Sequence, residues 1–260
     1  MLQAERLHQQ MKKLRLLNMP QAYESVAEQA AQKNLSYLDF LENLLESESK
    51  AKYERNVKLK MLWARFPYQK RLDQFDFSFQ PGVDERKVKE LASLRFIEQR
   101  ENVILLGPPG VGKTHLAIAL GLEAIVHDQS TYFVTMQELV DQLAQARDEH
   151  RLKEKMATFT RKTRLLIVDE IGYLPLDLFG ATCFFQIVSE RYERGSLLLT
   201  SNKSYADWGT IFQDNVMATA ILDRLLHHSH TLNIKGESYR LKDKKKAGVV
   251  RGAAASPTPS

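Results

Sequence analysis

The sequence is poor in the residues that stabilise secreted proteins and anchor membrane proteins. It has one cysteine, Cys183, in 260 residues, which excludes an internal disulfide and a zinc site built from several thiolates. No apolar run reaches the roughly 18–20 residues of a membrane-spanning helix, and the charged first residues lack the apolar segment of a signal peptide. We therefore expect a cytoplasmic protein that makes no membrane contact.

Basic residues, in contrast, are concentrated in two segments of a chain whose net charge is +5. From Lys50 to Arg71 there are eight basic residues and one acid, and residues 147–164 hold seven basic residues and three acids. A solvated helix face or a charged surface hairpin would show the same pattern as a DNA-binding surface. Together the two segments favour DNA. The candidate contacts are Lys50, Lys52, Arg55, Lys58, Lys60, Arg151, Lys153, Lys155, Arg161 and Lys162.

The pattern of helices and breaks predicts two domains and a tail. Residues 1–66 have apolar residues at helical spacing and are expected to form a small helical domain. Residues 67–83 are punctuated by proline and glycine and are expected to be a linker. Residues 84–245 are expected to form an α/β domain that opens with a helix over 88–100. The basic, small-residue end, 246–260, has the composition of a disordered tail.

Within 84–245, short aliphatic runs alternate with amphipathic segments. The runs are NVILL, TYFVT, LLIVD and SLLLTS, and the segments between them have helical periodicity. Nearly continuous aliphatic strands are typical of a parallel sheet whose two faces are both covered by helices. The sequence therefore predicts an α/β fold with a parallel sheet between helices.

The segment GPPGVGKT, residues 107–114, follows the first of these strands and opens a helix. It fits the phosphate-loop pattern G-x-x-x-x-G-K-[ST], in which glycines let backbone N–H groups surround phosphate oxygens. Lys113 is expected to reach the β- and γ-phosphates, and the hydroxyl of Thr114 to bind Mg²⁺. The candidate nucleotide-binding residues are Gly107, Pro108, Pro109, Gly110, Val111, Gly112, Lys113, Thr114 and His115.

Acidic and polar residues follow two later strands. LLIVDE ends in Asp169 and Glu170, which places both acids at the carboxyl edge of the sheet, beside the phosphate loop. We expect Asp169 to hold Mg²⁺ and Glu170 to orient or activate the attacking water. In LLLTSNKS, Asn202 is the first choice for a contact to the γ-phosphate or the water, with Thr200 in reserve.

The segment AILDRLLHHSH, residues 220–230, carries an isolated arginine and three histidines. On sequence alone, a surface salt bridge explains Arg224 better than an arginine finger does. The histidines lack cysteine or carboxylate partners at metal-ligand spacing. We therefore interpret them as solvated or as facing a nucleic acid.

Taken together, GPPGVGKT, LLIVDE, TSN and DRLLH, in this order and spacing, resemble the AAA+ ATPases. The closest likeness is to their DnaC-like branch and the IstB transposition helper proteins. ARFPYQKRLDQFDF and RYERGSLLLTSN resemble IstB in particular, and the likeness covers nearly all of residues 1–245. The resemblance implies an ATPase that uses Mg²⁺, forms a ring or spiral of identical subunits on double-stranded DNA with little sequence preference, and aids an IstA-like transposase.

The resemblance also implies roles for individual residues. Arg224 becomes an arginine finger that acts on a neighbouring subunit's nucleotide, and Arg240 a sensor II residue that contacts the γ-phosphate in its own subunit. Too few residues follow TLNI for the usual helical lid, so a reduced or absent lid is expected. Further candidates are Arg191 and Arg194 for intersubunit contact, and Phe75 and Phe77 for enclosing the adenine.

Two alternatives stay open at this stage. A helicase loader of the DnaC type would share the fold, prefer single-stranded DNA and use its N-terminal residues to hold a helicase. A nucleotide-dependent scaffold would recruit a partner without needing hydrolysis. DNA preference separates the first from a transposition helper, and the activity of a Glu170→Gln variant separates the second.

Overall fold

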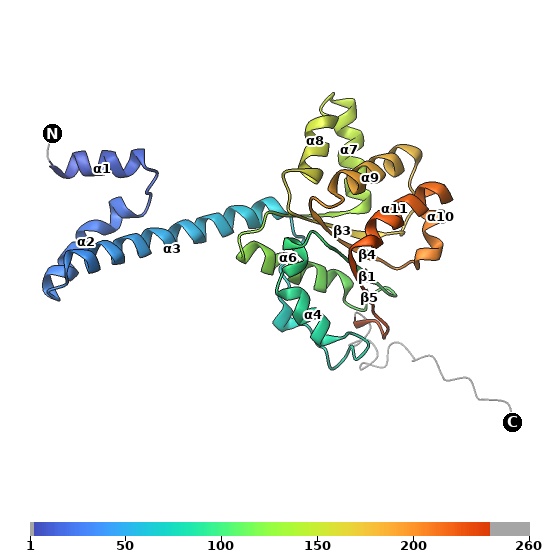
Figure 1. The fold of residues 1–260 in the computed structure, drawn as a ribbon, viewed down its shortest axis with the longest axis horizontal. Helices are drawn as coiled ribbons and strands as arrows, with labels where there is room; N and C mark the ends of the chain where they lie inside the picture. Colours follow the sequence, from blue (N-terminus) through green and yellow to red (C-terminus); the bar gives the residue numbers. More distant parts are fainter. Residues whose placement is uncertain (1–2, 240–260) are drawn as a thin grey trace, which may run out of the picture. The chain divides into compact units, whose positions relative to one another are not determined.

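The structure, a computed structural model, describes residues 3–239 and divides the chain into two compact units (Figure 1). The units are Met1–Leu62 and Trp63–Ser260, so the residues expected to form the linker, 67–83, belong to the second unit. None of the helices in residues 3–239 has the length and apolarity that crossing a membrane requires.

The first unit is helical and has a small core. Its helices are α1 (Gln3–Lys13), α2 (Met19–Gln32) and α3 (Tyr37–Ala64), whose last two residues belong to the second unit. The core contains the buried side chains of Met11, Met19 and Leu44. A capping box precedes helix α3, because the Asp39 N–H donates to the Ser36 hydroxyl and the Ser36 N–H donates to the Asp39 carboxylate.

A buried carboxylate holds the start of α2. Glu48 is 4% exposed and accepts hydrogen bonds from the backbone N–H groups of Leu17, Asn18 and Met19 and from the guanidinium of Arg55. Burial opposes ionisation of Glu48, but these four donors outweigh it and lower its pKa. Glu48 therefore caps the N-terminus of α2 from another helix.

The second unit is an α/β fold with a five-stranded parallel sheet in the order β2-β3-β4-β1-β5. The strands are β1 (Asn102–Leu106), β2 (Thr131–Thr135), β3 (Leu165–Ile171), β4 (Ser196–Ser201) and β5 (Ser229–Asn233). The helices are η1 (Leu72–Gln74), α4 (Glu85–Ala92), α5 (Arg95–Glu98), α6 (Lys113–Val126), α7 (Met136–Asp148), α8 (Leu152–Thr160), α9 (Leu178–Arg191), η2 (Tyr205–Asp207), α10 (Trp208–Phe212) and α11 (Asn215–His227).

Helices cover both faces of the sheet, as the aliphatic strands predict. Every residue of β1 and β4 is buried. One face packs against α7, α9 and α11, whose buried side chains join strand residues in one apolar cluster. Figure 1 shows α6 on the opposite side of the sheet from these helices. The phosphate-loop segment lies between β1 and α6, at the carboxyl ends of the strands.

The prediction of a single helix over 88–100 is wrong. Leu94 has a left-handed backbone, with φ of 63°, and separates α4 from α5. The side chains of Leu91, Leu94, Phe96 and Ile97 are all buried. One straight helix would point Leu91 and Phe96 to nearly opposite sides, so the break at Leu94 lets all four reach the core.

Candidate nucleotide-binding site

The phosphate loop adopts a conformation that its glycines make possible. Gly110 and Gly112 have φ of 82° and 101°, in the left-handed region that side chains disfavour. A Cβ atom on Gly112 would lie 2.6 Å from Cε2 of Phe75, and one on Gly110 would clash with the Ser238 hydroxyl. The loop therefore needs glycine for its backbone and for the two segments that pack on it.

Lys113 and Thr114 begin α6 and turn inward. Lys113 is 7% exposed, and its ammonium group donates to the carbonyl oxygens of Gly107 at 2.7 Å and Pro108 at 2.9 Å. The hydroxyl of Thr114 lies 3.1 and 3.0 Å from the two carboxylate oxygens of Asp169. The loop thus joins the end of β3 through one side-chain contact.

Asp169 is 3% exposed and is held from both neighbouring segments. It accepts hydrogen bonds from Thr114 in α6 and from the hydroxyl of Thr200 in β4. Burial raises its pKa, while the two hydroxyl donors and the nearby charge of Lys113 act in the opposite direction. A buried carboxylate beside a threonine hydroxyl is an oxygen donor set that suits Mg²⁺, so these residues fit the expected metal.

Glu170 sits at an irregularity in the sheet. The register between β3 and β4 shifts between Val168 and Ile171, and Glu170 has φ of 63°. Its N–H donates to the Thr200 hydroxyl at 3.0 Å, so one threonine fixes both acidic residues. A bulge of this kind redirects a side chain, and strained backbone concentrates at functional sites. Glu170 is exposed and lines the same pocket as Lys113 and Thr114.

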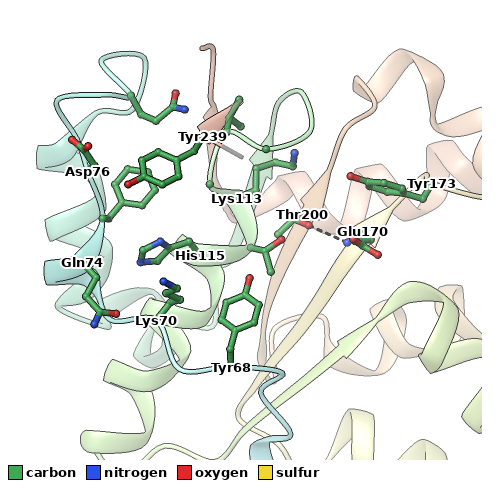
Figure 2. Close-up of a pocket in the computed structure, with 16 residues that line it drawn as sticks. Tyr68, Lys70, Gln74, Asp76, Lys113, His115, Glu170, Tyr173, Thr200 and Tyr239 are labelled. Atoms are coloured by element: carbon green, nitrogen blue, oxygen red, sulfur yellow. Dashed lines mark hydrogen bonds between the residues drawn. The ribbon is translucent and has the colours of Figure 1, made fainter. Parts of the chain in front are cut away.

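This pocket has a volume of about 260 Å³ and three walls (Figure 2). Figure 2 shows Gln74 and Asp76 along one side, Glu170 and Tyr173 along the opposite side, and Lys113 and Thr200 between them. The phosphate loop and the start of α6 line the pocket through residues 110–115. The lining residues that the sequence patterns did not single out are Tyr68, Lys70, Gln74, Asp76, Gln80, Tyr173 and Tyr239.

The segment 234–239, which follows β5, lies over the phosphate loop. The Tyr239 N–H donates to the Gly110 carbonyl at 2.9 Å. The rings of Tyr239 and Phe79 make an edge contact, with their centres 5.2 Å apart. Gln80 donates from its side chain to the Glu237 carbonyl at 2.7 Å. Within residues 3–239 no helix follows β5, and the part of the cover that the structure describes comes from 234–239 and the expected linker.

The expected linker contributes more to the pocket than its composition suggests. Phe75 lines the pocket and packs 4.8 Å from Phe77, which does not line it. His115 of α6 also lines the pocket, with Nε2 2.9 Å from the Arg71 carbonyl oxygen. Burial lowers the pKa of His115. The aromatic residues of 67–83 were the only sequence signal for this wall, and nothing in their spacing gave its direction.

The structure distinguishes the two residues considered at the end of β4, Thr200 and Asn202. Thr200 contacts Asp169 and Glu170 and lines the pocket, whereas Asn202 does not line it. Arg224 is half-buried in α11 and donates to the Ala220 carbonyl, with its guanidinium 5.0 Å from the ring centre of Phe185. It too is absent from the pocket of its own chain. Arg240 lies outside the described residues.

The expectation that Arg191 contacts a neighbouring subunit is wrong. Its side chain is 1% exposed, and its guanidinium donates to five backbone carbonyls, those of Phe159, Thr160, Thr163, Arg164 and Ser196. Burial lowers its pKa to about 9, so it stays charged at neutral pH. Arg191 joins the end of α8 to the starts of β3 and β4 and is a structural residue.

The candidate DNA-binding residues fall in both units. In the first unit Lys50, Lys52 and Lys58 are exposed, Lys60 is partly buried, and Arg55 pairs with Glu48. In the second unit Lys153 and Arg161 are exposed, and a groove of about 360 Å³ beside α7 and α8 is lined by four basic residues. These are Arg65, Arg151, Lys155 and Lys162, with Glu149 paired to Arg151 and Glu154 nearby.

A family model described as IstB-like ATP binding protein matches residues 9–247. The chain belongs to this family. It is 52% identical over 238 residues to a Pseudomonas aeruginosa protein named as an ATP-binding protein of insertion sequence IS21, covering 92% of this chain and 89% of that protein. It is 48% identical over 241 residues to the corresponding IS5376 protein of Geobacillus stearothermophilus, covering 93% of this chain and 96% of that one.

Solved structures give the fold. The crystal structure of DnaI matches with a TM-score of 0.55 and 22% identity over 64% of this chain and 91% of that chain. A structure of DnaA bound to AMPPCP and single-stranded DNA matches with a TM-score of 0.52 and 17% identity over 71% of this chain and 56% of that chain. These likenesses show an AAA+ P-loop NTPase fold and, at such identities, nothing finer.

Proposed function

We propose that this insertion-sequence ATP-binding protein hydrolyses ATP and uses the nucleotide to control its assembly on duplex DNA, where it aids the transposase of the element. The observation that carries the proposal is the arrangement around Thr200. Its hydroxyl holds the buried Asp169 next to Thr114 and fixes the backbone of Glu170 at the same pocket. A metal-binding pair and a separate, exposed carboxylate within one pocket suit hydrolysis as well as binding.

Nucleotide binding would use the loop and both covering segments. Backbone N–H groups of residues 107–112 would hold the phosphates, helped by the N-terminus of α6. The ammonium group of Lys113 would leave the carbonyls of Gly107 and Pro108 and bind the β- and γ-phosphate oxygens. The wall formed by 68–80 and Tyr239 would enclose the base and ribose.

Thr114 and Asp169 would hold Mg²⁺, which when bound would offset the negative charge of the phosphates. Glu170 would orient the attacking water and accept its proton. Its side chain lines the pocket on the side opposite Gln74 and Asp76. Thr200 would contribute indirectly, because its hydroxyl would keep the Asp169 carboxylate and the Glu170 backbone in place. These roles rest on the positions of the side chains within one unit.

Completion of the site would require a second subunit. Arg224 lies outside its own pocket, and α11 presents it half-buried on the surface of the second unit. An arginine that approaches the γ-phosphate from a neighbouring copy would stabilise the transferred phosphoryl group. We therefore expect a homo-oligomer with ATP between subunits, whose assembly depends on nucleotide.

DNA binding would rest on phosphate contacts from the basic residues of α3 and of the groove beside α7 and α8. Such contacts position a protein on DNA without reading bases, so we expect little sequence preference and a steep decrease in affinity with salt. Deformability of the duplex would then bias the choice of target.

Fluorescence anisotropy with labelled duplex and single-stranded DNA tests this proposal. We expect ATP-dependent, cooperative binding that favours duplex and weakens strongly between two salt concentrations. Glu170→Gln should bind ATP and DNA but hydrolyse ATP much more slowly, and Lys113→Ala should lose nucleotide-dependent DNA binding. Preference for single strands would indicate a helicase loader instead. Absence of DNA binding under all conditions would leave a recruitment scaffold.

A further inference from the structure

Three side chains with metal-binding atoms meet on the surface of the second unit, away from the nucleotide pocket. They are Glu193, in the turn after α9, His227, the last residue of α11, and His228, which follows it. Their ligand atoms all lie within 4.8 Å of one another. The histidines have no carboxylate partner nearby in the sequence, and the fold supplies one from a distant segment. We infer that these three residues bind a divalent transition-metal ion, with zinc the ion that they suit best.

The backbone at each ligand is fixed by other residues. The Asn102 N–H donates to the carbonyl of His228 at 2.8 Å, and Arg100 donates from its side chain to the carbonyl of Glu193 at 2.9 Å. The turn that carries Glu193 closes with the Gly195 N–H on the carbonyl of the buried Arg191, at 3.0 Å. Because the backbone is held at both segments, only side-chain rotations are needed to form the site.

The side chains are already partly oriented for a metal. The Tyr192 hydroxyl lies 2.8 Å from Nδ1 of His227. When Nδ1 donates that hydrogen bond, Nε2 carries the lone pair, and histidine ligands are commonly oriented in this way by a partner on the other ring nitrogen. The ring centres of His227 and His228 are 4.1 Å apart, and Nε2 of His228 is 4.0 Å from Oε1 of Glu193.

Two imidazoles and a carboxylate form a donor set typical of zinc with one open position for water. With Zn–N distances of about 2.0–2.1 Å, tetrahedral donors lie roughly 3.3 Å apart. The present separations of up to 4.8 Å must therefore shrink somewhat. All three side chains are exposed, so they can rotate without disturbing the core. A bound ion would join the turn after α9 to the end of α11 and stabilise the folded unit.

The test is a zinc titration of the full chain, in the absence of nucleotide, against a chromophoric zinc indicator. We expect one tightly held zinc ion per chain, and at least about a tenfold loss of affinity in both His228→Ala and Glu193→Gln. His230→Ala is the matched control, because it removes a nearby imidazole that pairs with Glu101 and lies outside the cluster. Asp169→Asn is a second control, which reports any zinc held at the phosphate loop.

Thermal unfolding gives a readout that needs no activity. At one fixed zinc concentration, zinc should raise the melting temperature of the unmodified chain and of His230→Ala, and should raise that of His228→Ala much less. Three results would overturn the inference: no zinc bound, equal affinity in His228→Ala and His230→Ala, or loss of the ion only in Asp169→Asn. The last of these would place the ion at the nucleotide site and leave the proposed ATPase unaffected.

Discussion

Replacing Thr200 with valine removes one hydroxyl and keeps the shape of the side chain. In the structure this hydroxyl donates to the Asp169 carboxylate and accepts from the Glu170 N–H at 3.0 Å. The variant therefore loses two hydrogen bonds that meet at one oxygen, in a position where the residue is 1% exposed. The expected result is a protein that folds and binds nucleotide but hydrolyses it poorly.

The magnitude follows from the partners of the hydroxyl. A hydrogen bond to a charged group contributes about 1.5–3 kcal/mol, and one between neutral groups about 0.5–1.5 kcal/mol. The loss is near the lower end of the sum, about 2 kcal/mol, since Thr114 still donates to Asp169. If all of it falls on the transition state, kcat decreases about thirtyfold.

The assay is steady-state ATP hydrolysis with saturating DNA, together with binding of a fluorescent ATP analogue. Thr200→Ser keeps the hydroxyl and is the matched control, with activity expected within a few-fold of the parent. Because the Thr200 hydrogen bond lowers the pKa of Asp169, its loss should raise that pKa. The acidic limb of the pH–rate profile should accordingly move to higher pH in Thr200→Val and stay in place in Thr200→Ser.

Asn202→Ala provides the comparison that can refute this reasoning. Asn202 was the first choice from the sequence, and the structure gives it no place in the pocket lining. If Asn202→Ala lowers kcat strongly while Thr200→Val hydrolyses ATP at the parent rate, the role given to Thr200 is wrong. The water-positioning residue would then be Asn202, in an arrangement reached only with nucleotide bound.

Three further predictions concern stability and the loop. Glu48→Gln should destabilise the first unit by about 3 kcal/mol, seen as faster amide exchange in α2. Since the pKa of Glu48 is lowered below its ordinary 4.5, its contribution is present above that pH and lost as the pH falls further, and the variant should lack this acid-sensitive part. Gly112→Ala should weaken ATP-analogue binding at least about tenfold, because it forces a left-handed alanine against Phe75. Arg191→Met should cost roughly 3–5 kcal/mol in urea unfolding, against little change for the exposed Arg194→Met.

Local sequence patterns determined the elements and the chemistry of the loop. The aliphatic runs predicted β1, β2, β3 and β4 and the parallel, doubly covered character of the sheet, since those signals lie within a few residues of each other. GPPGVGKT and LLIVDE named the loop and the two acids because phosphate binding demands glycine, lysine and threonine at fixed spacing. The break at Leu94 was missed, since burial of four apolar side chains, a tertiary demand, overrode the helical pattern.

Tertiary structure decided everything that depends on distant segments meeting. The order of the strands brings β4 beside β3 and β1, which makes Thr200 and not Asn202 the partner of Asp169. Tertiary packing also places 68–80 and 234–239 around the loop, a position that no spacing of residues in either segment predicted. Packing also buries Arg191, which the resemblance to IstB had made a candidate for intersubunit contact. It brings Glu193 close to His227 and His228. The sequence states which groups are present, but only packing of the whole chain sets the distances on which their hydrogen bonds and ligand bonds depend.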